Sequence, residues 1–403
     1  METVIVIGGG ASGMLAALTA AEASRRRVLL LERQQRPGRK LLSTGNGRCN
    51  LTNIGASPEN YHGNDRSFAA PALEKFGSAD ALEFFSSLGL VTVSAYGGRV
   101  YPLSDSANSV LDVLRFELTR RGVELRCSCP ARELRRAKGG FAVMTDEGEL
   151  SADYVIAACG GAAGAKLGGV MDGYELLKPL GHKRTALYPA LTQIICDSPY
   201  PRSLKGVRAD CALRLLRGDK LAAQSRGELQ FTDTGVSGPA AFDVSRAAST
   251  GGAGLSLSCN FLADHGIDQV LDMLKARRER LPDIEAGELF TGIIHNRLGR
   301  MIVKFAAINN SVAVGSLSDA ELLRAAKAAC GLILPVRGVE GFAGAQITAG
   351  GLDTAFFHPE TLESRLIPRL FACGELLDID GDCGGYNLQW AWSSGRLAGR
   401  LGG

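Results

Sequence analysis

Three glycines near the amino terminus, Gly8, Gly10 and Gly13, have the G-x-G-x-x-G spacing of a dinucleotide-binding turn. They follow an apolar run, Val4–Ile7, that predicts a buried strand, and they precede an alanine-rich segment that predicts a helix. Gly8 would permit a tight turn, Gly10 would let a pyrophosphate approach bare backbone, and Gly13 would let the helix pack close to the strand. The free N–H groups and positive dipole end of that helix would hold the phosphates.

An acidic residue, Glu32, ends the second apolar run, Val28–Leu31. In a dinucleotide-binding unit an acid at this place holds the ribose hydroxyls of the adenine nucleotide, whereas an Arg would favour a 2′-phosphate. The G-x-G-x-x-G pattern alone is a weak signal, but strand, turn, helix, second strand and acid occur here together. The segment is therefore predicted to bind FAD or NAD; the alternative is a glycine turn that serves packing alone.

The segment 33–53 after this acid is basic, and it is too rich in Gly and Asn to predict a helix. A loop at this place would cross the pyrophosphate and approach the reactive ring of the cofactor. Its side chains Arg39, Lys40 and Arg48 would neutralise phosphate charge. The alternative is a solvated basic loop.

Two later segments, 154–161 and 369–375, predict buried strands that end in glycine. Because open α/β sheets bind ligands at the carboxyl ends of their strands, the paired glycines that end the first of these segments are expected at the same sheet edge as the first turn. A helix is also predicted from near Gly385 to Gly402. If the cofactor is a flavin, the N-terminus of this helix would point at the N1/O2 edge of the ring, where negative charge develops on reduction.

The secondary structure that the sequence predicts changes along the chain. Residues 65–92 and 109–121 predict helices, 97–102 a turn, and 123–129, 140–145 and 149–151 the strands of a meander, with Cys127 and Cys129 pointing the same way. After Pro189 the sequence has short β-like runs and then mostly helical segments. The pattern typical of the nucleotide-binding domain returns near Gln346. The predicted organisation is therefore a first nucleotide-binding part at 1–189, a β-rich insert at 190–264, a helical insert at 265–342 and a second nucleotide-binding part at 343–403.

Composition excludes several classes of protein. The 45 Lys and Arg residues nearly balance the 42 Asp and Glu residues, so no global field favours nucleic acid or a membrane as a partner. The ten cysteines are scattered without C-x-x-C pairs, so neither zinc nor a disulfide framework is expected. The apolar N-terminus lacks the basic region of a signal peptide, and no run of about 20 apolar residues spans a bilayer. The expected compartment is the cytoplasm.

Three stretches carry a resemblance to a known family: the N-terminal fingerprint, KLLSTGNGRCN at 40–50, and GELLDIDGDCGGYNLQWA at 374–391. With FTDTGVSGP at 231–239 and VYP at 100–102, the whole chain resembles the BaiN/YhiN-like family of FAD-dependent oxidoreductases, which includes aminoacetone oxidase-like flavoproteins. The resemblance implies an α/β fold with a two-part, Rossmann-like FAD-binding domain of the glutathione-reductase type, interrupted by an inserted β-plus-helical domain.

The same resemblance, together with the patterns above, gives the predicted cofactor-binding residues. They are Gly8, Gly10, Ala11, Ser12, Gly13, Glu32, Arg33, Lys40, Ser43, Arg48, Cys49, Asn50, Ala131, Cys159, Gly160, Gly161, Gly374, Glu375, Asp378, Gly385, Asn387 and Leu388. The chain departs from the family at Asp233, where a His is more frequent, and at Cys159, where a Thr is usual.

Only one complete fingerprint is present, so FAD is predicted as the bound cofactor, with NAD(P)H as a transient donor or O₂ as an acceptor. The predicted function is flavin-mediated hydride transfer to or from a small organic substrate bound between the FAD domain and the insert. One alternative is a flavin-containing binding or regulatory protein without turnover. Another is a disulfide oxidoreductase using Cys49, which lacks a resolving cysteine at short spacing. The patterns identify no catalytic acid or base, no metal site and no oligomeric state.

Overall fold

In the computed structural model, which describes residues 1–402, the first apolar run of the chain forms the central strand of a parallel sheet. Strand β1 (Glu2–Ile7) pairs in parallel with a neighbour on each side. The sheet has the order β20 (Leu370–Ala372), β11 (Tyr154–Ala157), β1, β2 (Arg26–Leu31) and β7 (Glu124–Arg126). The last four residues of β1 and of β2 are all buried, as expected for strands covered on both faces.

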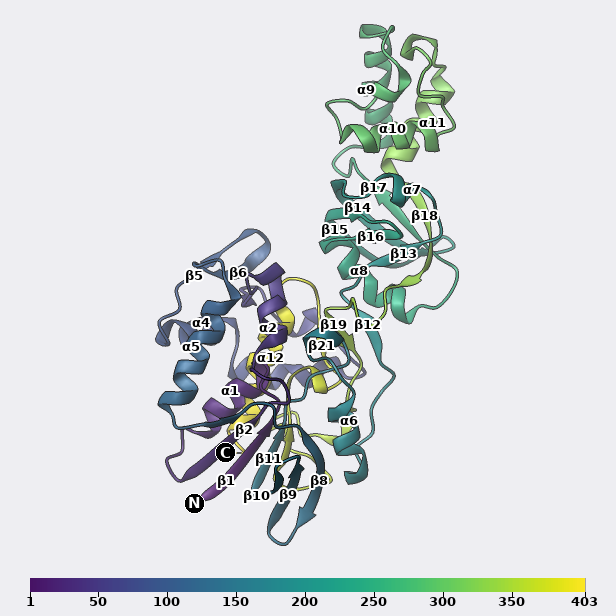
Figure 1. Cartoon of the computed structure of the whole chain (residues 1–403). Helices are drawn as coiled ribbons and strands as arrows, with labels where there is room; N and C mark the ends of the chain where they lie inside the picture. The colour runs from purple at the N-terminus through teal and green to yellow at the C-terminus, as the bar shows by residue number, and fades with distance from the viewer. Residues whose placement is uncertain (403) are drawn as a thin grey trace. The chain divides into compact units, whose positions relative to one another are not determined.

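The strand β20 joins this sheet from the far end of the sequence, so the predicted interrupted domain is confirmed. The chain forms two units, Met1–Tyr188 with Gln346–Gly403, and Pro189–Ala345. Both marked chain ends lie in the first unit (Figure 1). The fold is therefore a Rossmann-type α/β domain with an insert.

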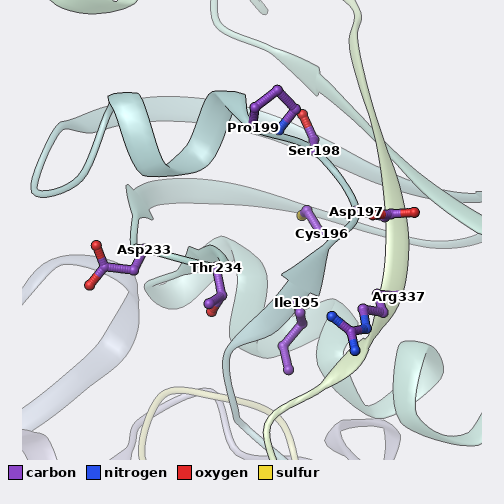
Figure 2. Close-up of a pocket in the computed structure, with 8 residues that line it drawn as sticks. All are labelled: Ile195, Cys196, Asp197, Ser198, Pro199, Asp233, Thr234 and Arg337. Atoms are coloured by element: carbon purple, nitrogen blue, oxygen red, sulfur yellow. The ribbon is translucent and has the colours of Figure 1, made fainter.

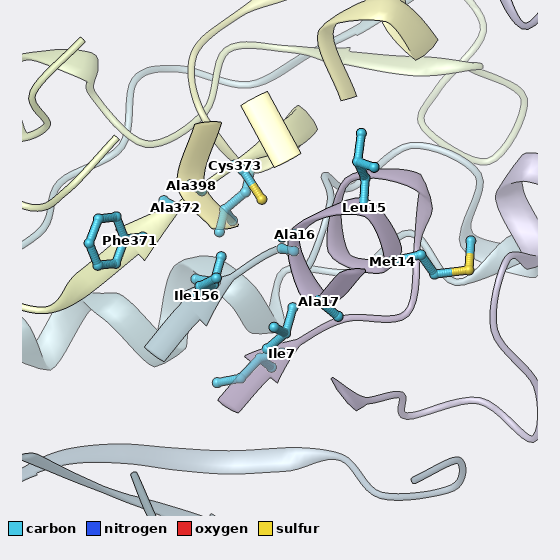
Figure 3. Close-up of a cluster of buried hydrophobic side chains, with 14 of the residues drawn as sticks. Ile7, Met14, Leu15, Ala16, Ala17, Ile156, Phe371, Ala372, Cys373 and Ala398 are labelled. Atoms are coloured by element: carbon cyan, nitrogen blue, oxygen red, sulfur yellow. The ribbon is translucent and has the colours of Figure 1, made fainter. Parts of the chain in front are cut away.

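Two helices of the first unit pack against each other next to the glycine turn that follows β1. Helix α1 (Ala11–Ala20) packs against α12 (Tyr386–Gly399), and small residues permit the close approach. A Cβ at Gly395 would lie 2.4 Å from the Ser12 carbonyl oxygen, and one at Gly399 would lie 2.6 Å from that of Ala16. Their apolar side chains pack with those of β1, β11 and β20 in one buried cluster (Figure 3). The C-terminal segment thus completes the core that the N-terminal segment begins.

The first unit also contains other helices and small antiparallel sheets. Its helices are α2 (Arg39–Ser43), α3 (Ala70–Lys75), α4 (Ser78–Ser87), α5 (Ala107–Arg120) and α6 (Asp172–Leu177). Its small antiparallel sheets are the meander β8 (Ala131–Ala137), β9 (Gly140–Thr145) and β10 (Gly148–Ala152), the sheet β3 (Thr52–Asn53), β6 (Arg99–Pro102) and β5 (Thr92–Ser94), and the pair β4 (Tyr61–His62) and β21 (Asp380–Gly381).

Four local predictions for this unit were wrong. The meander begins at β8, since the segment 123–129 instead gives β7 of the parallel sheet, and Cys127 and Cys129 lie beyond its end. The basic loop contains the short helix α2, and most of 97–102 is strand β6. The last helix ends at Gly399 rather than at Gly402. Each error concerns pairing partners or boundaries, which a local pattern does not encode.

The second unit is built around a closed barrel. Its strand order is β13 (Ile194–Cys196), β16 (Gly235–Ser237), β15 (Lys220–Phe231), β14 (Arg208–Arg217), β17 (Leu255–Asn260) and β18 (Leu332–Val339). Its helices are α7 (Tyr200–Ser203), α8 (Pro239–Thr250), α9 (Ile267–Arg280), α10 (Asn296–Phe305) and α11 (Asp319–Cys330).

The boundaries drawn at 190–264 and 265–342 do not separate two cores. Strand β18 closes the barrel between β17 and β13, although it lies in the segment that was predicted as helical. Helix α8 lies within the segment predicted as β-rich. Buried side chains of the barrel and of α9, α10 and α11 form one hydrophobic cluster.

Candidate cofactor site

The turn between β1 and α1 has the geometry that only glycine permits. Gly8 has φ +114°, and a Cβ there would lie 2.3 Å from the Ala158 carbonyl oxygen. At Gly13 a Cβ would lie 1.8 Å from the Gly8 carbonyl oxygen. At Gly10, by contrast, nothing lies within 4 Å of an added Cβ, so the backbone there borders open space. This is the arrangement expected of a turn that a phosphate approaches.

Glu32 is buried at the end of β2 and holds this turn. Its Oε2 accepts a hydrogen bond from the Gly9 N–H at 2.9 Å, and its Oε1 accepts one from the Gln34 N–H at 2.7 Å. Each carboxylate oxygen has a second lone pair, which a ribose hydroxyl can use. The acid therefore both shapes the turn and remains able to bind a nucleotide.

An ion pair connects the basic loop to the second glycine-terminated strand. Lys40 Nζ lies 2.6 Å from Glu375 Oε2, and both side chains are partly exposed. Glu375 Oε1 accepts a hydrogen bond of 2.8 Å from the N–H of Thr348, on β19 (Ile347–Ala349). A Cβ at Gly161 would lie 2.8 Å from that same oxygen. The structure thus brings together Lys40, Glu375 and the paired glycines after β11, although the sequence did not predict this pairing.

Two other residues of the basic loop are already engaged within the protein. Arg48 pairs with Asp105, and its guanidinium carbon lies 4.4 Å from the centre of the Tyr101 ring. Its charge is therefore balanced locally, which weakens its predicted role in neutralising phosphate. Cys49 is fully buried, and burial raises the pKa of its thiol to about 12. A thiol that stays protonated at neutral pH is a poor nucleophile, which argues against a disulfide oxidoreductase that uses Cys49.

The N-terminus of α12 faces the same loop. Gly385 has φ +107°, and a Cβ there would lie 2.5 Å from the Thr52 carbonyl oxygen and 3.0 Å from Asn50 Oδ1. Asn50 Oδ1 is buried and has no hydrogen-bond partner among residues 1–402. A buried acceptor without a donor is costly, and a ligand N–H would satisfy it.

Two predicted residues of the first turn of α12 have different surroundings. The Asn387 side chain holds the preceding loop, since its Oδ1 accepts from the Gly381 N–H at 2.8 Å and its Nδ2 donates to the Gly381 carbonyl at 2.7 Å. Leu388 packs against the hydrophobic core. Their side chains are therefore structural, and only their backbone N–H groups, which precede the regular helical hydrogen bonds, are suited to a ligand.

The remaining predicted residues divide into two sets. Near the turn, a Cβ at Gly374 would lie 2.4 Å from Ser12 Oγ, and Cys159 Sγ lies 3.5 Å from the Ile7 carbonyl oxygen. Ala11 is the first residue of α1. Gly160 directly follows Cys159 and has φ +72°. Others make contacts of their own: Arg33 lies 3.7 Å from Asp172, Ser43 donates to the Lys40 carbonyl, Asp378 accepts from the Asn64 N–H, and Ala131 begins β8.

These features fit FAD better than a packing turn. The open backbone at Gly10, the acid at Glu32 and the unpartnered Asn50 Oδ1 are suited to the pyrophosphate, the ribose and a polar ring edge. Among residues 1–402, no group of three or more His, Cys, Asp or Glu side chains is arranged to hold a metal ion.

The second unit has a surface hollow of about 310 Å³. Figure 2 shows the residues that line it, which are Ile195, Cys196, Asp197, Ser198, Pro199, Asp233, Thr234 and Arg337. Asp233, which departs from the family pattern, pairs with Lys205 at 2.6 Å. Both polar and apolar side chains line the hollow, which lies where β13 has an irregular register with β18, a feature that re-aims side chains.

The fold and the turn agree with a comparison of the chain with protein families. The model described as the HI0933-like protein Rossmann domain matches residues 2–401. The chain belongs to this family. Membership in the HI0933-like family places it among FAD-dependent oxidoreductases, and the sequence-based resemblance is thereby confirmed.

Two curated relatives cover most of the HI0933-like chain. The 3-dehydro-bile acid delta(4,6)-reductase of Clostridium scindens is 39% identical, over 92% of this chain and 91% of its own length. The ribosomal RNA dihydrouridine synthase of Escherichia coli is 28% identical, over 89% of this chain and 88% of its own.

A solved structure supports the fold. The 3-ketosteroid delta1-dehydrogenase of Sterolibacterium denitrificans, in complex with 1,4-androstadiene-3,17-dione, matches with a TM-score of 0.51 at 15% identity, over 99% of each chain. In the part of the HI0933-like chain that the structure describes, no helix is both long and apolar enough to cross a membrane.

Proposed function

We propose that this protein is a FAD-dependent reductase that saturates a carbon–carbon double bond conjugated to a carbonyl group in a small organic substrate. The observation that carries the proposal is the relative at 39% identity, whose name describes reduction of the delta(4,6) double bonds of a 3-dehydro-bile acid. When bound, FAD supplies two-electron hydride chemistry at the flavin ring. NAD(P)H is the proposed donor and meets the flavin transiently, because the chain carries a single complete fingerprint.

The residues described above would hold and tune the cofactor. The turn at Gly8–Gly13 would bind the pyrophosphate, and Glu32 the adenosine ribose. The Lys40–Glu375 ion pair would hold the basic loop next to the second glycine-terminated strand. The N-terminus of α12 would stabilise negative charge on the reduced ring through its backbone N–H groups.

A second candidate substrate has the same chemistry. The relative at 28% identity is named for making dihydrouridine in ribosomal RNA, and uracil also has a double bond conjugated to a carbonyl. We favour the small substrate because identity to the bile acid reductase is higher and the charge of the chain is nearly balanced.

We also propose that the protein acts in the reducing cytoplasm, since all ten cysteines are free thiols.

The test uses protein whose flavin has been photoreduced without oxygen. It is mixed in separate reactions with a 4,6-dien-3-one steroid, with the saturated 3-ketosteroid as a matched control, and with unmodified ribosomal RNA. The proposal expects rapid return of the oxidised flavin spectrum with the dienone only. Reoxidation by ribosomal RNA alone would support the second candidate, and reoxidation by none of the three would favour a binding or regulatory protein.

A further inference from the structure

A histidine and an aspartate that are far apart in the sequence are in contact just before the N-terminus of α12. His62, on β4, has its Nε2 2.7 Å from Oδ1 of Asp382, which directly follows β21. Both side chains are partly exposed, at 23% for His62 and 36% for Asp382. The pair is therefore accessible to a ligand, unlike a buried structural pair.

The carboxylate of the pair is held in place from a second direction. Asn60 Nδ2 donates to Asp382 Oδ2 at 3.3 Å, and the Asp382 N–H donates to the Asn60 carbonyl oxygen at 3.0 Å. The antiparallel pairing of β4 with β21 sets His62 opposite Asp380. These contacts fix the ring that Asp382 orients, as carboxylates do for catalytic histidines.

Predicted cofactor residues flank the pair on both sides. Asp378 Oδ2 accepts a hydrogen bond from the N–H of Asn64, two residues after His62. On the other side Asn387, in the first turn of α12, donates to the Asp382 carbonyl oxygen at 3.2 Å. The pair thus lies beside the N-terminus of α12, which is the element predicted to face the flavin ring.

We propose that His62 is the proton donor of the reduction, with Asp382 as its positioning residue. The inference rests on the proposed function, because saturating a conjugated double bond requires a hydride at one carbon and a proton at the other. Reduced FAD would supply the hydride, which carries both electrons, and would thereby become oxidised. The proton comes from His62, which becomes neutral and is protonated again from water.

The ring atom that gives the proton is Nδ1, because Nε2 is directed at Asp382. The other titratable groups on β4, on β21 and on the residues that flank β21 are the carboxyls of Asp378 and Asp380, the Cys383 thiol and the phenols of Tyr61 and Tyr386. Burial raises the pKa of the Tyr61 phenol far above neutrality, so this group does not compete as a proton donor near pH 7.

The experiment separates proton transfer from cofactor binding. The holoenzyme and the variant His62→Gln are compared in two anaerobic half-reactions, which are reduction of the flavin by dithionite and its reoxidation by a 4,6-dien-3-one steroid. His358→Gln, at an exposed histidine of the same unit, is the matched control. Bound FAD per chain and the unfolding temperature are measured for every variant, and reoxidation is followed across pH in H₂O and D₂O.

We expect His62→Gln to keep its FAD and its reduction rate and to reoxidise about 10²- to 10⁴-fold more slowly, with loss of the basic limb of the pH profile and of the solvent isotope effect. Asp382→Asn should reoxidise more slowly with an altered pH profile, and it decides the question if His62→Gln fails to fold. A His62→Gln protein with the wild-type rate and pH profile overturns the inference alone. Wild-type protein that no conjugated substrate reoxidises overturns the proposed function, and the inference with it.

Discussion

The backbone of Gly13 lies so close to that of Gly8 that a Cβ at residue 13 would be 1.8 Å from the Gly8 carbonyl oxygen. No side chain fits at this distance, so the start of α1 depends on glycine. The same contact positions the N–H groups that are proposed to hold the pyrophosphate.

The variant Gly13→Ala should therefore lose FAD. Even one methyl group must push α1 away from the turn, and the expected result is colourless protein or protein with a small fraction of the wild-type flavin. Flavin released on denaturation, quantified per chain by chromatography, measures the loss. Gly341→Ala is the control, because an added Cβ there meets nothing within 4 Å. Full flavin content in Gly13→Ala would show that the turn does not bind the cofactor.

Removing the acid at the end of β2 should weaken FAD binding without abolishing it. Glu32→Ala leaves the Gly9 and Gln34 N–H groups and the ribose without an acceptor, which should cost about 1–3 kcal/mol. The expected dissociation constant rises by roughly 5- to 150-fold. Titration of the apoprotein with FAD measures it, with the exposed Glu74→Ala as the control. Equal affinity in the two variants would mean that Glu32 serves the turn alone.

The Cys49→Ser variant should keep its turnover. The thiol is buried with a pKa of about 12, so no thiolate is present near neutrality to react. Burying a hydroxyl in its place should lower stability by about 1–3 kcal/mol. Steady-state rates and the unfolding temperature measure the two effects. A loss of turnover at full FAD content would restore the disulfide oxidoreductase reading.

Part of the loss in the free energy of unfolding at acid pH should depend on Glu117. The guanidinium of Arg120, together with that of Arg121, lowers the pKa of this carboxyl to about 2. Because the folded value lies below the unfolded one, the stabilisation is present above about pH 4.5 and is lost as the pH falls towards 2. Glu117→Gln should be less stable at pH 7 by about 1 kcal/mol after solvent screening, and equally stable near pH 2. An equal deficit at both pH values would point to lost packing instead.

The sequence predicted the parts of the fold that local pattern encodes. The run Val4–Ile7, the glycine spacing and Glu32 occur together in one short segment, and the turn, the two strands and the acid agree with the prediction made from them. The predictions at 123–129 and 265–342 were wrong because strand pairing is decided by distant partners: β7 joins β2, and β18 closes the barrel.

The site shows the same division. Lys40 and Glu375 were both named from motifs, yet their ion pair spans 335 positions and no spacing rule reveals it. His62 has no motif of its own, and only the pairing of β4 with β21 shows its relationship to Asp382. The TyrHisGlyAsn sequence at 61–64 was the one available signal, since its glycine allows a close approach to Asp378.

We propose that this protein reduces a conjugated double bond with electrons held on FAD. The most direct measurement mixes one equivalent of photoreduced protein with a 4,6-dien-3-one steroid without oxygen, and follows the flavin spectrum and the mass of the steroid in the same sample. We expect oxidised flavin to return in step with a steroid product that is heavier by two hydrogens. Flavin that stays reduced while the steroid keeps its mass would contradict it.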